Sequence, residues 1–228
     1  MIDNGLVVDV GCGVGLGTRE LAAPERTVIG IDYDLDAAVT AASRAGGAYH
    51  VLAADGARLP LADRSVDWII SSHIIEHFVD PEAHVTELAR VLRPGGTALV
   101  LTPNETTDFE NPFHVHLFSP ESLDRMLGRH FGDVHVGGHD GTPEVKADFA
   151  ARRAQAAKVL RLDPLGLRFR IPRSWYVAAY STGTRAFYRL QARRHAGGAT
   201  TITAEDFAPT ETVDETTLSL FATARSPR

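Results

Sequence analysis

The chain has 228 residues, of which 44% are hydrophobic, and its 23 basic and 29 acidic side chains give a formal net charge of −6. This length and composition suit one domain with a sizeable core plus an insertion. We expect a cytoplasmic protein, because the single cysteine excludes an internal disulfide and the sequence shows neither a secretion signal nor a run of about eighteen apolar residues.

The first predicted strand, residues 6–10, runs into a turn that is dense in glycine and opens a helix. Gly11, Gly13 and Gly15 have no Cβ, so the turn can adopt positive φ and a ligand can approach its backbone amides. The dinucleotide pattern G-x-G-x-x-G fails here, because its third glycine would stand at Leu16. We therefore predict a nucleotide-like ligand and disfavour a nicotinamide-dependent oxidoreductase.

Acidic residues follow the next two predicted strands. The strand over residues 27–31 leads to Asp32, whose carboxylate can accept hydrogen bonds from both hydroxyls of a ribose. A helix is predicted over residues 34–44, and a third strand over residues 49–53 precedes Asp55. These carboxylates therefore stand where a parallel sheet presents its ligand site.

Histidines follow the fourth predicted strand, which covers residues 66–72. The sequence from His73 to His77 reads H-x-x-E-H, the pattern of inverted zinc peptidases, which we disfavour because it follows a parallel strand in a cofactor-binding fold. His114 and His116 come after the fifth predicted strand. Because an unperturbed imidazole titrates near neutrality, all four are candidate proton acceptors, although each could instead cap a helix or fill a polar pocket.

Apolar runs alternate with segments of helical length along the first half of the chain, including a helix predicted over residues 81–92 and a strand over 97–102. This alternation specifies a parallel sheet that is covered on both faces and binds its ligand at the carboxyl ends of the strands. A sixth strand over residues 131–136 and a seventh over 216–224 complete the predicted sheet.

The segment between the last two predicted strands is basic. From Lys146 to His195 it holds twelve basic and two acidic residues, interleaved with aromatic side chains. We interpret residues 144–195 as a helical cap for an anionic acceptor, and we expect peripheral membrane contact, if any, through residues 159–190. Alternatively, the basic helices cover the acidic core of their own subunit or of a second copy, which leaves monomer and homodimer open.

Three motifs in order resemble the class I S-adenosylmethionine-dependent methyltransferases. They are D-x-G-x-G-x-G from Asp9, the Asp55-Gly56 step after the third strand, and Pro94-Gly95-Gly96 before the fifth, within a match over about residues 5–136. The resemblance implies S-adenosylmethionine as the cofactor. It also implies a leading helix before the first strand, so either the start is truncated or another segment covers the cofactor.

The resemblance further implies an α/β fold with a Rossmann-like, doubly wound, mostly parallel seven-stranded sheet and an antiparallel last strand. A helical insertion is expected between the sixth and seventh strands. The expected division is a catalytic core over residues 1–137, a basic helical insertion forming a substrate cap over 138–212, and a closing strand over 213–228.

Site residues are assigned on the same resemblance, which gives Asp32 to the ribose and Asp55 to the adenine amino group. The residues expected to bind the cofactor are Asp9, Gly11, Cys12, Gly13, Gly15, Asp32, Tyr33, Asp55, Gly56, Ser72 and His73. The residues expected to act on the acceptor are His77, His114 and His116.

A metal-binding alternative concerns the histidines after the fourth strand. Ubiquinone-pathway O-methyltransferases and small-RNA 2′-O-methyltransferases carry E-x-x-E-H there and bind a divalent metal with it. Here His73 replaces the first glutamate, which would shift the preference from magnesium toward zinc, manganese or iron in a site of His73, Glu76, His77 and His116. Many relatives carry Glu-His at this place with no known metal, so no metal is expected.

The expected function is methyl transfer to an oxygen of a small molecule or glycan, with anionic and lipid-linked acceptors included and N-methylation left open. One alternative is a metal-assisted 2′-O-type methyltransferase acting on RNA. Nucleic acid is disfavoured as a partner, because the catalytic half is acidic and the pI is near 5.9. The other alternative is a scaffold that binds the cofactor without catalysis.

Overall fold

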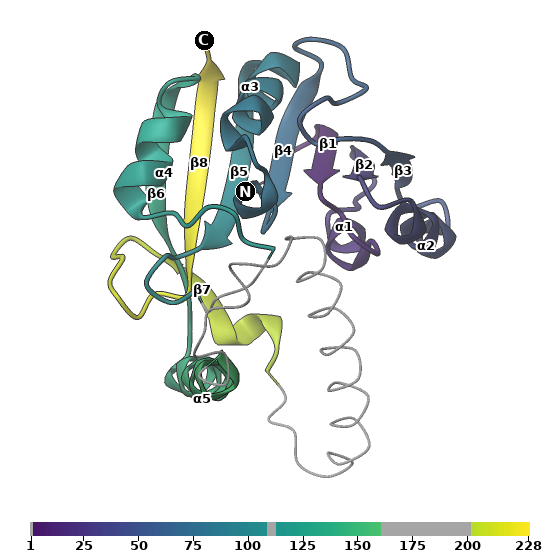
Figure 1. The fold of residues 1–228 in the computed structure, drawn as a ribbon. Helices are drawn as coiled ribbons and strands as arrows, with labels where there is room; N and C mark the ends of the chain where they lie inside the picture. The colour runs from purple at the N-terminus through teal and green to yellow at the C-terminus, as the bar shows by residue number, and fades with distance from the viewer. Residues whose placement is uncertain (1, 109–112, 161–201) are drawn as a thin grey trace.

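A central eight-stranded sheet with helices on both faces organises the described chain (Figure 1). The computed structural model describes residues 2–108, 113–160 and 202–228. The strand order across the sheet is β3-β2-β1-β4-β5-β8-β6-β7.

The elements follow each other along the chain as strands and helices in alternation. The strands are β1 (Gly5–Val10), β2 (Arg26–Asp32), β3 (His50–Ala53), β4 (Val66–Ser72), β5 (Leu92–Pro103), β6 (Phe131–Gly141), β7 (Phe207–Thr210) and β8 (Ser219–Pro227). The helices are α1 (Leu16–Glu20), α2 (Leu35–Ala45), α3 (Pro81–Val91), α4 (Pro120–Leu127) and α5 (Pro143–Leu160), with short 3-10 turns η1 (Ile75–His77) and η3 (Ala204–Asp206).

The predicted α/β fold is confirmed. Strands β1 to β5 pair with each other in parallel, and β8 runs antiparallel between β5 and β6. An antiparallel last strand inside a mostly parallel, doubly wound sheet is the arrangement expected from the sequence.

The sheet has eight strands where seven were predicted. β6 continues to Gly141, and residues 207–210, which were expected to belong to the helical insertion, form β7 along this extension. The close approach of β7 to β6 requires glycine in β6, because a Cβ on Gly138 would lie 2.7 Å from Cγ2 of Thr210. The count differs because strand pairing depends on a distant partner, which no local pattern in residues 207–210 reveals.

Local signals explain the helix boundaries. The Asp34 side chain accepts hydrogen bonds from the backbone amides of Asp36 and Ala37, which caps the start of α2, and Gly46 ends the helix at φ +55°. Asp80 caps α3 in the same way, with Pro81 at its first position. Both helices therefore begin within one residue of their predicted starts.

The Pro-Gly-Gly segment before the fifth strand forms an irregular part of β5 instead of a separate turn. Val66 of β4 pairs with Leu92, but Trp68, two residues on, pairs with Thr97. The intervening residues leave the ladder, and Gly95 adopts φ +79° there.

Two apolar layers flank the sheet. Side chains of α3 and α4, such as Val85 and Leu123, pack with Val8 and Val100 on one face, whereas a smaller cluster around Tyr49 packs on the other. Because β1 to β5 are parallel, their carboxyl ends meet at one edge. That edge carries the residues that the sequence singles out.

Candidate functional site

The glycine turn after β1 is shaped by three glycines with different surroundings. A Cβ on Gly11, at φ +80°, would lie 2.1 Å from Cγ2 of Ile74, and a Cβ on Gly15, at φ +79°, would lie 2.3 Å from the Tyr49 hydroxyl. Gly13, at φ +53°, has no described atom within 4 Å of its Cβ position. Packing therefore requires the two outer glycines, and the middle one leaves open space above the turn.

Two carboxylates lie at the end of β2 and just beyond the end of β3, and the first of them contacts the glycine turn. Asp32 accepts hydrogen bonds from the amide of Gly13 at 2.7 Å and from the amide of Asp34 at 2.8 Å, one on each oxygen. Asp55 is exposed and accepts from the amide of Ala57 at 2.9 Å. Because a carboxylate offers about four lone-pair directions, both side chains keep acceptor capacity for a ligand.

Asp9 and Cys12 lie inside the turn instead of lining it. The buried Asp9 carboxylate accepts a hydrogen bond from the Thr18 hydroxyl at 2.6 Å, and burial raises its pKa. Burial also raises the pKa of the Cys12 thiol to about 12, with the Asp9 charge as a smaller cause. These two predicted cofactor residues brace the turn from within.

Of the other two predicted cofactor residues near these strand ends, Gly56 is buried and Tyr33 is exposed. A Cβ on Gly56 would lie 2.9 Å from the Phe78 ring. Tyr33 is 82% exposed directly after Asp32, so its ring is available at the carboxyl edge of the sheet.

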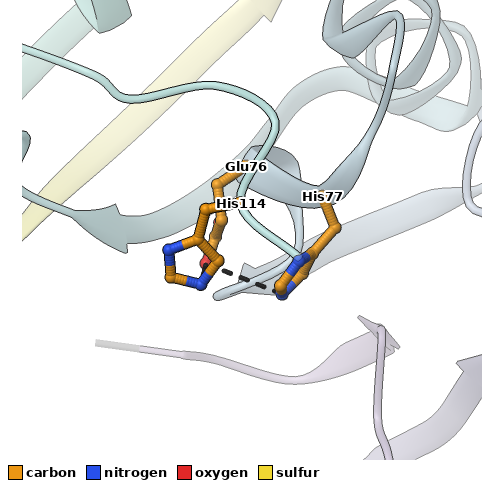
Figure 2. Close-up of side chains that lie close together, drawn as sticks. All are labelled: Glu76, His77 and His114. Atoms are coloured by element: carbon orange, nitrogen blue, oxygen red, sulfur yellow. Dashed lines mark ion pairs between the residues drawn. The ribbon is translucent and has the colours of Figure 1, made fainter. Parts of the chain in front are cut away.

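A second cluster lies beyond β4 and surrounds a buried carboxylate (Figure 2). Glu76 is buried in η1, and its Oε2 accepts a hydrogen bond from the Thr102 hydroxyl of β5 at 3.1 Å. Its Oε1 has no hydrogen-bond partner among the described residues. The Nε2 atoms of His77 and His114 each lie 4.0 Å from this oxygen.

The other ring nitrogen of each of these histidines is held in place. Nδ1 of His77 lies 2.9 Å from the carbonyl oxygen of Phe113, and Nδ1 of His114 lies 2.9 Å from Oδ2 of Asp108. Both partners are acceptors, so both Nδ1 atoms donate. The segment that carries His114 is anchored in turn, because the amide of Val115 donates to the Glu76 carbonyl at 2.7 Å.

The structure thus brings His77 and His114 together but separates His116 from them. Nε2 of His116 donates to the carbonyl oxygen of Val79 at 3.1 Å. Of the four residues in the metal-binding alternative, His116 is therefore replaced at the carboxylate by His114. That His116 contacts the acceptor stays a prediction, because His116 does not belong to the cluster around Glu76.

His73 occupies a conformation that is rare for residues with a side chain. Its φ is +54°, and its amide donates to the carbonyl oxygen of Leu101 at 2.9 Å. Nδ1 of His73 then lies 3.8 Å from Oε1 of Glu76. Desolvation lowers the pKa of His73, and the Glu76 charge opposes that shift.

A cavity of about 460 Å³ opens beside the cluster. Ser72, His73, Asp108 and His114 line it from the core, and Phe149 of α5 and Phe207 of β7 line it from the predicted insertion. The Phe207 ring stacks on the His139 ring, with centroids 5.8 Å apart and planes within 4°. The cavity therefore joins the strand ends to the start of the insertion.

Sequence reasoning missed three residues of this site: Thr102 as the partner of Glu76, Asp108 as the partner of His114, and His139 on the cavity wall. Thr102 had a usable signal, since it ends an apolar strand. Asp108 lies in irregular backbone, where spacing does not indicate which side chains meet.

The basic insertion is described only at its two ends. Lys146 pairs with Asp140, Arg152 pairs with Asp148 at 2.7 Å, and Arg153 donates to the carbonyl oxygen of Thr106 at 2.6 Å. The remaining cap of residues 161–195, with most of its basic and aromatic side chains, falls outside the described residues. Among the helices that are described, none is long and apolar enough to cross a membrane.

Comparisons with known proteins point to methyltransferases. Residues 8–100 match the family described as "Methyltransferase domain". The chain is 39% identical over 127 residues to a probable S-adenosylmethionine-dependent methyltransferase of Mycolicibacterium smegmatis, a match covering 53% of this chain and 49% of that protein. It is 30% identical over 126 residues to a ubiquinone biosynthesis O-methyltransferase of Rhizobium etli, covering 54% and 50%.

Solved structures show the same fold at low sequence identity. The [4+2]-cyclase SpnF matches with a TM-score of 0.62 and 19% identity, over 99% of this chain and 77% of that one. Phosphoethanolamine N-methyltransferase 2 of Haemonchus contortus, solved with S-adenosyl-L-methionine, matches with a TM-score of 0.59 and 17% identity, over 99% and 50%. The chain spans about half the length of the curated relatives it matches.

Proposed function

We propose that this chain carries a class I S-adenosylmethionine-dependent methyltransferase domain, which the family match and the relatives support, and that it methylates an oxygen atom of a small molecule or glycan. The observation that carries the proposal is the convergence of His77, His114 and Glu76 beside a cavity at the carboxyl edge of the sheet. Fold alone would not suffice, since one structural neighbour is a [4+2]-cyclase.

The residues of the glycine turn fit S-adenosylmethionine. Open space above Gly13 admits a ligand to the backbone, and Asp32 beside it keeps lone pairs for the two ribose hydroxyls. The exposed Asp55 carboxylate can accept from an adenine amino group, and the exposed Tyr33 ring offers an apolar face. When bound, the cofactor supplies a methyl group on a sulfonium that needs no further activation.

The acceptor has to lose a proton if it is an alcohol or phenol. The methyl group leaves sulfur and bonds to oxygen, and the proton of the hydroxyl passes to a group of the chain. His114 lines the cavity, so its imidazole is the proposed acceptor of this proton, and the buried Glu76 carboxylate 4.0 Å away would stabilise the positive charge that the ring gains. Positioning supplies most of the remaining rate enhancement.

The insertion is proposed to complete the acceptor site. Phe149 and Phe207 contribute aromatic rings to the lining of the cavity, and Ser72 and His73 contribute polar groups. Such a lining suits a ring-bearing acceptor that carries a hydroxyl. We retain an anionic or lipid-linked acceptor on the basic composition of the insertion, and we retain monomer or homodimer as the assembly.

Transfer of a labelled methyl group tests this function. Wild-type protein is incubated with radiolabelled S-adenosylmethionine and a panel of phenols, sugars and sugar phosphates, and products are checked for O- or N-methylation. We expect transfer by the wild type and a loss of about 10²–10⁴-fold in turnover for His114→Ala. Turnover should be unchanged for the control His135→Ala, because His135 is an exposed residue of β6 that pairs with Glu211. Cofactor binding without transfer to any acceptor would instead indicate a scaffold.

A further inference from the structure

The starting observation is a buried carboxylate oxygen without a hydrogen-bond partner. The Glu76 side chain is 2% exposed, and only Oε2 has a described partner, the Thr102 hydroxyl. A buried carboxylate oxygen is strongly unfavourable unless a cation or a proton donor compensates its charge. The atoms around Oε1 of Glu76 should therefore indicate whether a cation or a proton donor compensates its charge.

The surroundings are imidazole nitrogens in a fixed orientation. Asp108 and the Phe113 carbonyl hold the Nδ1 protons of His114 and His77, so in the neutral rings Nε2 carries a lone pair. Both Nε2 atoms lie 4.0 Å from the Glu76 oxygen, itself a lone-pair atom. Lone pairs on three converging atoms repel each other unless a positive charge lies among them.

The arrangement has the features of a metal site in which hydrogen-bond acceptors orient the metal-binding histidines. Oε1 of Glu76 and the two Nε2 atoms lie within 4.8 Å of one another. Metal-binding histidines commonly donate their second ring N–H to a carboxylate or a backbone carbonyl, as His114 and His77 do. An ion would draw the three atoms inward by about 0.5 Å or less to reach ordinary bond lengths of about 2.0–2.1 Å.

We propose that Glu76, His77 and His114 bind one divalent transition-metal ion of the Zn²⁺ type, with Asp108 orienting His114. Two imidazoles and one carboxylate favour zinc, iron or manganese over magnesium and calcium, which prefer oxygen ligands. Three protein ligands would leave a coordination position free, and His73 and the cavity that His114 lines are neighbours of the cluster.

Tertiary contacts, and not sequence spacing, select His114 over His116 as the third ligand. His114 and Asp108 enter it through the loop anchored on the Glu76 carbonyl, whereas His116, two residues later, is engaged by Val79. The role of the ion rests on the proposed function: with the ion bound, the Nε2 atoms of His77 and His114 are ligands and no longer take the acceptor's proton. The ion would instead lower the pKa of the acceptor hydroxyl, whose proton would pass to solvent. Binding of the ion does not rest on that function and is measured without it.

Zinc binding to protein freed of metal by a chelator tests the proposal. Titration calorimetry with Zn²⁺ is expected to give one site per chain. Glu76→Gln, His77→Ala and His114→Ala should each weaken it by about 100-fold or more, and Asp108→Asn should weaken it by about 10-fold to 100-fold. His116→Ala and His135→Ala should bind zinc as the wild type does.

Two results would overturn the metal site. One is a wild-type chain that binds no zinc at this stoichiometry, which would leave a protonated imidazole as the partner of Glu76. The other is zinc binding that persists in His77→Ala and His114→Ala. Circular dichroism and binding of S-adenosylhomocysteine by each variant show that it is folded, so a failed metal site and a failed methyltransferase assignment are told apart.

Discussion

At the scale of single residues, the glycine turn and the histidine cluster are joined through Ile74. The space a Cβ on Gly11 would need is filled by the Ile74 side chain, which stands between His73 and Glu76 in the sequence. Gly11 thus matters for more than ligand approach, because it lets the segment after β4 pack against the turn. A change at this glycine should therefore affect both stability and the neighbouring cluster.

Gly11→Ala is expected to destabilise the fold by about 2–4 kcal/mol, because alanine is strained at φ +80° and its methyl group would clash with Ile74. The matched control is Gly17→Ala in α1, where no described atom lies within 4 Å of the new Cβ and alanine favours the helix. Urea denaturation compares the two. Equal stability of both variants would show that the turn is looser than described.

Residue types at the site could be predicted, but their partners could not. The sequence placed His77 and His114 among the candidates because they follow strand ends, where a parallel sheet binds its ligands. It could not choose between His114 and His116, which are two residues apart in irregular backbone. The choice depends on where the Glu76 carbonyl anchors that segment and on the position of Asp108, both of which are tertiary contacts.

At the scale of elements, a buried histidine ties α3 to β4 and to the loop after β3. His84 is fully buried; its Nε2 lies 3.0 Å from the Ser71 hydroxyl and its Nδ1 lies 2.8 Å from the Gly56 carbonyl oxygen. The ring also stacks on Phe78, with centroids 4.4 Å apart. Desolvation lowers the pKa of His84 to about 4, so the ring is neutral in the fold.

This neutral histidine makes stability depend on pH. The unfolded chain takes up a proton at His84 near its ordinary pKa of 6.5, and the folded chain only near 4, so its contribution is complete above 6.5 and is lost as the pH falls toward 4. The expected loss is about 3 kcal/mol. Urea denaturation at pH 7 and pH 4.5 measures it, and His84→Gln should lose this part of the pH dependence.

Most elements were predictable because their signals are local. Capping aspartates, a C-terminal glycine and apolar runs gave α2, α3 and the parallel strands close to their observed bounds. β7 was not predictable, because residues 207–210 pair with an extension of β6 that is distant in sequence. Its formation depends on the small size of the glycines in β6, not on the propensity of its own residues.

At the scale of the whole molecule, the two parts of the site lie along one edge of the sheet. The ends of β1, β2 and β3 present the glycine turn, Asp32 and Asp55, whereas β4, β5, β8 and β6 border the histidine cluster and the cavity. We propose that the first part holds the cofactor and the second part the acceptor. The domain division at residues 137 and 212 remains a prediction, with α5 as the described start of the insertion.

The most direct test of the central claim is titration calorimetry with S-adenosylhomocysteine and, separately, NAD. We predict saturable one-to-one binding of S-adenosylhomocysteine and none of NAD. Asp32→Ala should weaken the binding by about 10-fold to 100-fold through loss of the ribose acceptor, and Asp36→Ala on α2 should leave it unchanged. A folded chain that ignores S-adenosylhomocysteine, or binds it equally well without the Asp32 carboxylate, would contradict the account.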